Sequence, residues 1–189
     1  MTEPRNLLDL PADLPVPVDD GACNHLPGMR LPTIALPATS GNTVDFSRLS
    51  GRSVVYVYPR TGRPDQPLPT SWDEIPGARG CTPQSCAYRD LAAELGALGA
   101  RVFGLSTQDT VYQQEAAERL HLPFPLLSDE RRELTTALSL PTFEVDGMTL
   151  IKRLTLVIDD GAIETVFYPV FPPDADAAHV VAWLREHQA

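Results

Sequence analysis

The sequence predicts an α/β protein in which a mixed central β-sheet is flanked by helices. From about residue 53 to residue 138, apolar strand-like runs alternate with amphipathic helix-like segments. An Asp-Gly hairpin signal near residue 160 then joins two further strands, and a helix-like segment closes the chain. Helices between strands favour parallel pairing and a hairpin pairs its strands antiparallel, so one sheet is expected to contain both. The 189 residues suffice for one domain with a full hydrophobic core.

The first 26 residues are expected to form an extended arm ahead of the folded domain, which we place at residues 27–189. The arm has no sustained hydrophobic periodicity, and prolines recur at Pro4, Pro11, Pro15 and Pro17. Cys23 lies in this arm and is interpreted as an incidental surface thiol. Cys23 and His25 are too few ligands for a metal site, which usually needs three or four.

The first long strand of the sheet is expected at Ser53–Tyr58. This run is β-branched and aromatic without polar alternation, which is typical of a strand buried on both faces of a sheet. It ends at Pro59. Before it, a short apolar stretch at 31–36 and a turn at Gly41-Asn42 lead to a strand-like segment at 43–46.

Residues 62–79 form a proline-rich insertion between this strand and the next helix. Loops of this length are uncommon inside compact domains and often serve function, so we expect it to overhang the start of that helix. Trp72 and Ile75 are the residues expected to hold it against the body of the protein. The alternative interpretation is a tolerated surface insertion.

The segment Gly80–Asp90 holds two of the three cysteines, Cys81 and Cys86. Thr82-Pro83 is a helix-start signal, and apolar residues at helical spacing continue the helix to about Leu98, just before Gly99. The dipole and free N–H groups of a helix start favour an anion, and such a place lowers the pKa of a cysteine and makes it reactive. In a helix, Cα atoms five positions apart are separated by about 8.5 Å. A disulfide needs less than about 7 Å, so the two thiols bond only if the helix start unwinds.

The remaining elements follow from capping, apolar and turn signals. Asp159-Asp160-Gly161 indicates a tight hairpin turn, and Pro141-Thr142 and Asp146-Gly147 also mark turns. Asp174 or Asp176 is expected to open the final helix, with apolar residues inward. In chain order we expect a strand at 101–106, a helix at 110–120, a strand at 124–127, a helix capped by 128–130 and ending near 138, strands at 154–158 and 163–167, and a last helix with Val180, Val181 and Leu184 inward.

Composition excludes several function classes. The formal net charge is −10 and the pI is about 4.7, which argues against binding nucleic acid or an anionic membrane surface. An odd count of three cysteines fits a reducing compartment. The N-terminus lacks the apolar core of a signal peptide and no run of about 18 apolar residues occurs, so we expect a cytoplasmic protein without a transmembrane helix. No metal or cofactor motif is present, and none is predicted.

Taken on residues alone, the two thiols leave three functions open. The first is redox catalysis through Cys81 and Cys86. The second is thiol–disulfide exchange or a redox-regulated holdase activity, although the Cys-x-x-Cys spacing of ordinary exchange proteins is missing. The third is a binding or structural module in which both cysteines are inert.

The chain resembles the peroxiredoxins, specifically the branch called peroxiredoxin Q or bacterioferritin comigratory protein. The resemblance covers about residues 27–188 and rests mainly on the block Gly80-Cys-Thr-x-Gln-x-Cys-x-x-Arg-Asp90, which follows a strand ending in Val57-Tyr58-Pro59. Further blocks match in the same order at Val102–Ser106, Leu126–Asp129 and Arg153–Ile158. The resemblance implies a thioredoxin-like fold and the reduction of hydrogen peroxide or organic hydroperoxides.

The same resemblance assigns roles to individual residues. Cys81 looks like the peroxidatic cysteine and Cys86 like the resolving cysteine. Apart from the resemblance, Cys23 is the alternative candidate for a back-up resolving thiol. Arg153 looks like the arginine that holds the thiolate and the peroxide, whereas without the resemblance it reads as a surface charge at a strand start. Thioredoxin or a similar thiol is the reductant that the branch implies, and a monomer is favoured over an oligomer.

One departure concerns the wall of the pocket. The family carries a Pro-x-x-x-Thr-x-x-Cys segment, but here Ala78 stands three residues before Cys81 and the proline, Pro59, lies 22 residues ahead. Thr61 follows Pro59 closely and is our candidate for the missing hydroxyl. Thr70 and Thr82 are weaker candidates. If none of these hydroxyls reaches the peroxide, its activation rests on backbone N–H groups and Arg153, and Arg79 then adds a second positive charge.

Overall fold

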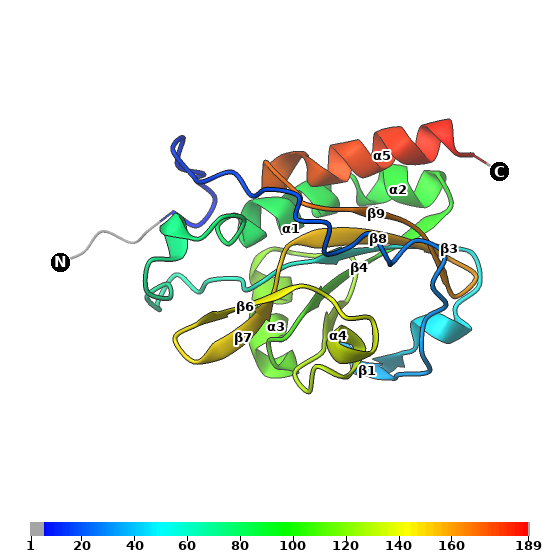
Figure 1. Cartoon of the computed structure of the whole chain (residues 1–189), viewed down its shortest axis with the longest axis horizontal. Coiled ribbons are helices and arrows are strands. Elements are labelled where there is room, and N and C mark those ends of the chain that lie inside the picture. Colours follow the sequence, from blue (N-terminus) through cyan, green and yellow to red (C-terminus); the bar gives the residue numbers. More distant parts are fainter. Residues whose placement is uncertain (1–5, 189) are drawn as a thin grey trace.

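The computed structural model describes residues 6–188 and contains a five-stranded mixed sheet with the strand order β5-β4-β3-β8-β9 (Figure 1). The central strand β3 pairs parallel with β4, β4 pairs parallel with β5, and β3 pairs antiparallel with β8, which forms a hairpin with β9. The predicted mixed sheet is therefore confirmed. The strands are β3 (Arg52–Val57), β4 (Ala100–Ser106), β5 (Leu126–Ser128), β8 (Leu154–Asp159) and β9 (Ala162–Phe167).

Helices cover both faces of this sheet. Figure 1 shows α1, α2 and α5 together on one side of the sheet and α4 on the opposite side. The α-helices are α1 (Cys81–Asp90), α2 (Ala92–Ala97), α3 (Thr110–Arg119), α4 (Glu133–Ala137) and α5 (Asp176–Glu186), and the short 3₁₀ helices are η1 (Phe46–Arg48), η2 (Trp72–Glu74) and η3 (Pro173–Ala175).

Strand β3 is buried on both faces, as its continuous apolar run predicts. Val54 and Tyr56 contribute to the core beneath α1 and α5, whereas Val55 and Val57 contribute to the core on the other face. All four side chains are fully buried. Alternate residues of a strand point to opposite faces, so only a run without polar positions fits this central place.

Two short hairpins lie outside the main sheet. They are β1 (Leu36–Pro37) with β2 (Thr43–Val44), and β6 (Thr142–Val145) with β7 (Met148–Ile151). The predicted turn at Asp146-Gly147 joins β6 to β7, and Asp160-Gly161 joins β8 to β9; all four residues have positive φ. The sequence does not predict β6 and β7 as strands, because these segments bury only part of their surface and give a weak apolar signal.

The helix that begins near the paired cysteines differs from the prediction in two ways. It starts at Cys81, so Thr82 lies inside the first turn and does not cap it; Gly80 is the N-cap residue, with a φ of 105°. A break at Leu91 divides the predicted single helix into α1 and α2. At Asp129 the prediction holds, because its carboxylate accepts hydrogen bonds from the backbone N–H groups of Leu134 and Thr135 at the start of α4.

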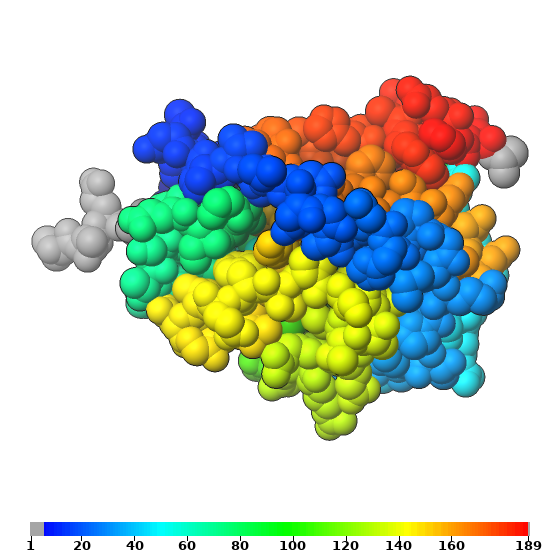
Figure 2. Space-filling model, viewed as in Figure 1, coloured from blue at the N-terminus to red at the C-terminus, as the bar shows by residue number. Residues whose placement is uncertain are grey.

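The N-terminal arm lies against the folded body. Figure 2 shows residues of the arm crossing the surface beside the 62–79 loop and the C-terminal part of the chain. Asp20 forms an ion pair with Lys152 (3.0 Å) and accepts a hydrogen bond from the Tyr168 hydroxyl (2.9 Å). Residues 1–5 of the predicted arm lie outside the described residues.

The interpretation of Cys23 as a surface thiol is wrong. Its side chain is 3% exposed and packs in the core on the α4 side of the sheet, close to Leu26. Burial, together with the negative charges of Asp20 and Asp19, raises the pKa of Cys23 to about 12. The cysteine is therefore held as a neutral thiol inside the protein, because a thiolate is poorly solvated there.

Among residues 6–188, no helix combines the length and apolar character needed to cross a membrane.

Candidate active site

Cys81 is the first residue of α1 and is 3% exposed. The backbone of Gly80 immediately before it has a left-handed conformation that glycine adopts without strain. A Cβ at this position would lie 2.2 Å from Cγ of Pro173 and 3.0 Å from Cδ2 of Leu10. Gly80 thus lets the arm and the segment before α5 pack directly against the turn that presents the thiol.

Arg153, predicted from the family resemblance, lies beside Cys81. It stands between β7 and β8, is 3% exposed, and places its Nη2 atom 3.2 Å from the Cys81 sulfur. A guanidinium at this distance stabilises negative charge on the sulfur, and its planar donors suit an anionic group in a buried place.

The backbone before Cys81 holds this guanidinium in place. Arg153 donates through Nη2 to the carbonyl oxygens of Ala78 (3.0 Å) and Arg79 (3.1 Å), and through Nε to the carbonyl of Gly77 (3.2 Å). The Cys81 sulfur is also 3.6 Å from the Ala78 carbonyl oxygen, to which a thiol donates. One arginine therefore ties together the end of the proline-rich loop and the start of α1.

Cys86 lies on the same helix, and all three cysteines of the chain are free thiols. Burial raises the pKa of the half-buried Cys86 thiol, while the charge of Arg89 opposes that rise. Helix geometry separates the Cα atoms of Cys81 and Cys86 by about 8.5 Å. A Cys81–Cys86 disulfide requires about 7 Å or less, so its formation requires α1 to unwind locally.

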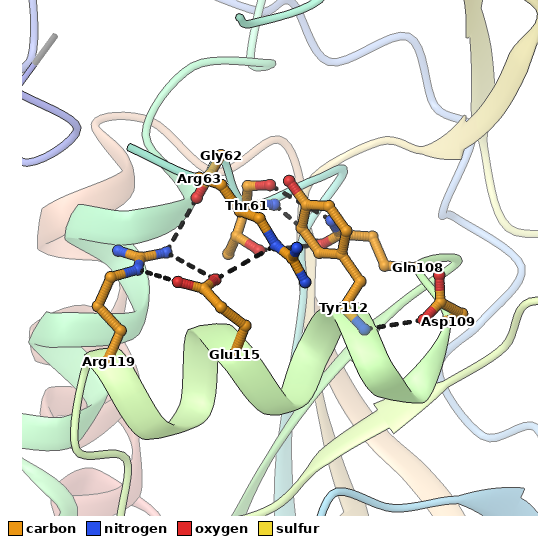
Figure 3. A network of polar contacts seen from close by, with 8 residues as sticks. All are labelled: Thr61, Gly62, Arg63, Gln108, Asp109, Tyr112, Glu115 and Arg119. Atoms are coloured by element: carbon orange, nitrogen blue, oxygen red, sulfur yellow. Dashed lines mark hydrogen bonds and ion pairs between the residues drawn. The ribbon is translucent and has the colours of Figure 1, made fainter. Parts of the chain in front are cut away.

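Thr61 and Pro59, the two remaining predicted site residues, are both buried after the end of β3. Thr61 donates to the side-chain oxygen of Gln108 through its backbone N–H (3.0 Å) and its hydroxyl (3.1 Å). The Gln108 amide donates in return to the Thr61 carbonyl (3.3 Å). Figure 3 shows this pair at one end of a polar network on α3.

Helix α3 also holds the next residues of this segment. Arg119 donates to the Gly62 carbonyl (2.9 Å) and pairs with Glu115 (2.6 Å). The guanidinium carbon of Arg63 lies 4.3 Å from the centre of the Tyr112 ring, a cation–π contact (Figure 3). Sequence reasoning misses this anchoring, because Arg119 on α3 lies 57 residues beyond Gly62.

The other residues named for the pocket wall have different surroundings. Within residues 6–188, the polar contacts of the Cys81 sulfur are Arg153 and the Ala78 carbonyl, so the threonine assignment stays a prediction. The backbone N–H of Thr70 donates to Asp146, and Thr82 is buried in the first turn of α1.

Arg79, considered as a second positive charge for the site, binds the N-terminal arm and the proline-rich loop. Its guanidinium donates to the backbone carbonyls of Asn6 (3.3 Å) and Asp9 (3.1 Å) in the arm, and it pairs with Asp73 at 3.4 Å. The arm thus contacts the residue two positions before Cys81, and this contact occupies the guanidinium.

The proline-rich loop is packed against the body, as Trp72 and Ile75 predict. Trp72 is 4% exposed and forms a small core with Ala78, Val145 and Leu150, against which Ile75 packs. The loop therefore rests on the β6–β7 hairpin and delivers the three carbonyl groups that bind Arg153.

Several buried polar residues next to the site were not identified from sequence. Gln84 accepts a hydrogen bond from Arg153 and donates one to Asp176, and Tyr88 and Thr155 also donate to Asp176. Gln84 belongs to the cysteine block and could have been identified there. Asp176 reads in sequence as a helix-opening residue, so its local signal conceals a tertiary contact.

Comparison with known proteins agrees with this geometry. The Redoxin family matches residues 26–182. The chloroplastic peroxiredoxin Q of Oryza sativa subsp. japonica is 34% identical over 160 residues, spanning 84% of this chain and 66%, just under two thirds, of the rice protein. The chloroplastic peroxiredoxin Q of Sedum lineare is 33% identical over 149 residues, spanning 78% of this chain and 71% of that protein.

A solved structure supports the same grouping. The crystal structure of the peroxidoxin BcpB from Mycobacterium tuberculosis matches with a TM-score of 0.70 and 28% identity, and the match covers 87% of this chain and 100% of that one. The predicted thioredoxin-like fold is therefore confirmed. The chain belongs to the Redoxin family and, within it, to the peroxiredoxins of the peroxiredoxin Q and bacterioferritin comigratory protein branch.

Proposed function

We propose that this protein is a thiol peroxidase that reduces hydrogen peroxide and organic hydroperoxides, with Cys81 as the peroxidatic cysteine and Cys86 as the resolving cysteine. The observation that carries the proposal is the 3.2 Å contact between the Arg153 guanidinium and the Cys81 sulfur at the start of α1. A buried thiol beside a fixed positive charge is suited to react as a thiolate.

In the first step the Cys81 thiolate attacks the near oxygen of the peroxide. A sulfur–oxygen bond forms, the O–O bond breaks, and the sulfur is oxidised to a sulfenic acid while the leaving oxygen departs as water or an alcohol after protonation. The leaving oxygen carries developing negative charge, which the guanidinium of Arg153 stabilises. The Thr61 hydroxyl donates its hydrogen to Gln108, so the lone pairs of the Thr61 oxygen are available to accept a hydrogen bond from a peroxide O–H. Pro59 would form part of the same pocket wall.

In the second step the Cys86 thiol condenses with the sulfenic acid. The products are a Cys81–Cys86 disulfide and water, and the step needs α1 to unwind because both cysteines lie on one helix. A dithiol protein such as thioredoxin would then restore both thiols by exchange. A cytoplasmic location and a monomeric state belong to the same proposal, supported by the odd cysteine count and the acidic composition.

The direct test supplies one equivalent of hydrogen peroxide to the reduced protein and maps its disulfides by mass spectrometry. We expect loss of two thiols and a Cys81–Cys86 bond, and continued peroxide consumption when a thioredoxin system is added. Efficient insulin reduction without reaction with peroxide would instead favour a thiol–disulfide exchange protein. Inertness of both thiols toward peroxide would contradict either redox role.

Replacing Cys86 with serine is expected to limit the enzyme to a single turnover. The sulfenic acid on Cys81 then lacks its thiol partner, so further peroxide converts it to sulfinic acid. Cys23 is buried on the other face of the sheet and does not substitute for Cys86. Intact-mass measurement after increasing peroxide would detect the added oxygens. A Cys81–Cys23 disulfide in this variant would contradict the assignment of Cys86.

A further inference from the structure

A buried carboxylate outside the proposed reaction lies behind the site. Asp176 is the first residue of α5 and is 1% exposed. The N-cap residue of α5 is Ala175, so Asp176 does not occupy the capping position of the helix. The carboxylate is instead directed at groups on α1 and β8, so its role there is different from the helix-opening role that its sequence position suggests.

Three donors converge on one oxygen of Asp176. The Oδ2 atom accepts hydrogen bonds from Gln84 Nε2 (2.8 Å), the Tyr88 hydroxyl (2.9 Å) and the Thr155 hydroxyl (2.8 Å). A neutral carbonyl oxygen has two lone pairs for such donors, whereas a carboxylate is acceptor-only and binds them more strongly. Burial raises the pKa of Asp176, while the three hydrogen bonds and the charge of Arg153 oppose the rise.

Gln84 connects this carboxylate to the catalytic arginine. Its amide nitrogen donates to Asp176, and its carbonyl oxygen accepts from Nη1 of Arg153. Arg153 offers only donors and the carboxylate only acceptors, so the Gln84 amide has one orientation that satisfies both. Nη2 of the same guanidinium contacts the Cys81 sulfur, which makes a continuous path from Asp176 to the thiol.

The other two donors are themselves held rigidly. The Tyr88 ring stacks on Tyr56 with ring centres 4.5 Å apart, and Thr155 stands opposite Tyr56 in the β3–β8 pairing. All three side chains are fully buried. Asp176 is therefore anchored by α1 and β8 together, and its position relative to Gln84 is determined by the core.

We propose that Asp176 is a positioning residue, whose carboxylate orients Gln84 so that the Gln84 carbonyl holds Arg153 against Cys81. The inference rests on the proposed peroxidase function. The groups that face Asp176 are Gln84 and Tyr88 from α1, Thr155 from β8, and the charge of Arg153 before β8; Arg153 is the charged group that contacts Cys81.

The first test replaces Asp176 with asparagine, which has nearly the same size. Its neutral carbonyl oxygen accepts the same three hydrogen bonds more weakly than a carboxylate oxygen does, so the Gln84 amide is held less firmly in its orientation. We expect the rate constant for Cys81 oxidation by hydrogen peroxide to fall about tenfold, the scale of one charge-assisted hydrogen bond. Alkylation of Cys81 by iodoacetamide should shift to higher pH, because Arg153 stabilises the thiolate less well.

The second test reverses the polarity of the pair with the double variant Asp176→Asn, Gln84→Glu. The amide of Asn at 176 then donates to the carboxylate of Glu at 84, which accepts from Arg153, and the Asn carbonyl remains for Tyr88 and Thr155. We expect a rate constant within about threefold of the wild type, because each hydrogen bond is remade. A double variant that does not fold, or that stays tenfold slower, contradicts the proposal.

Leu184→Ala is the matched control, since it removes core contacts of the same helix about two turns beyond Asp176. This control variant should have a lower melting temperature than the wild type and an unchanged pH dependence of Cys81 alkylation. If it shows the same pH shift as Asp176→Asn, the role of Asp176 is merely structural and the proposal is contradicted.

Wild-type protein is measured in parallel. A wild-type Cys81 that does not react with peroxide contradicts the proposed function, whereas a reactive wild type with unchanged Asp176→Asn contradicts this inference alone.

Discussion

Replacing Cys81 with serine is expected to abolish peroxide turnover. The variant keeps the fold, since a hydroxyl fits where the thiol stood, but a serine hydroxyl is a far weaker nucleophile toward peroxide than a thiolate. We expect steady-state peroxide consumption with a thioredoxin system to fall by at least about 10³-fold, within the range caused by loss of a covalent nucleophile in other enzymes.

Cys23→Ala is the matched control for this experiment. The pKa of Cys23 is raised to about 12 by burial, so this thiol stays protonated and does not react with peroxide at neutral pH. The control should retain the wild-type rate constant, with some loss of stability because the side chain packs in the core. Turnover retained by Cys81→Ser, or lost by Cys23→Ala, would move the reactive thiol away from Cys81.

Replacing Arg153 with methionine is expected to have the second largest effect. Methionine keeps an unbranched apolar stem but removes the charged guanidinium, whose Nη2 atom lies 3.2 Å from the Cys81 sulfur. We expect the rate constant for Cys81 oxidation to fall about 10²–10³-fold, as when one donor to a developing negative charge is removed from an enzyme site. Stopped-flow measurement of the first oxidation, before any disulfide forms, isolates this step.

Arg153→Lys separates the charge from the hydrogen bonds. Lysine keeps the charge, but its ammonium cannot reproduce the planar fork that binds the carbonyls of Gly77, Ala78 and Arg79. Its rate constant should lie between those of the methionine variant and the wild type. Lys152→Met removes a neighbouring charge that pairs with Asp20 in the arm, and it should leave the rate unchanged. A wild-type rate in Arg153→Met would rule out the guanidinium as a participant.

Sequence reasoning predicts the elements that are stabilised by interactions between residues close together in the chain. The apolar run of β3, the Asp-Gly turn between β8 and β9 and the capping carboxylate of Asp129 are readable because propensity, period and turn chemistry act within a few residues. Sequence reasoning does not predict strands β6 and β7 or the break between α1 and α2. The β6–β7 hairpin packs against Trp72, which stands far away in sequence.

The candidate site divides in the same way. Cys81 and Cys86 are identified by the residues next to them in sequence. Helix geometry alone predicts a reactive thiol at the helix start and a Cα–Cα distance too long for a disulfide. Arg153 was found through the family resemblance and not through local chemistry, since an arginine before a strand has no distinctive pattern. The misreading of Cys23 has the same cause, because exposure is a property of the folded chain and not of the arm's composition.

The sequence by itself determined the mixed sheet, the helix that presents two thiols, and the need for that helix to unwind before they bond. Only the tertiary structure decided what surrounds the first thiol. Arg153 reaches Cys81 across 72 residues, and Asp176 reaches Gln84 across 92. Such pairs leave no local period or cap, since they form only when separate elements close around one buried place and each polar group there requires a partner.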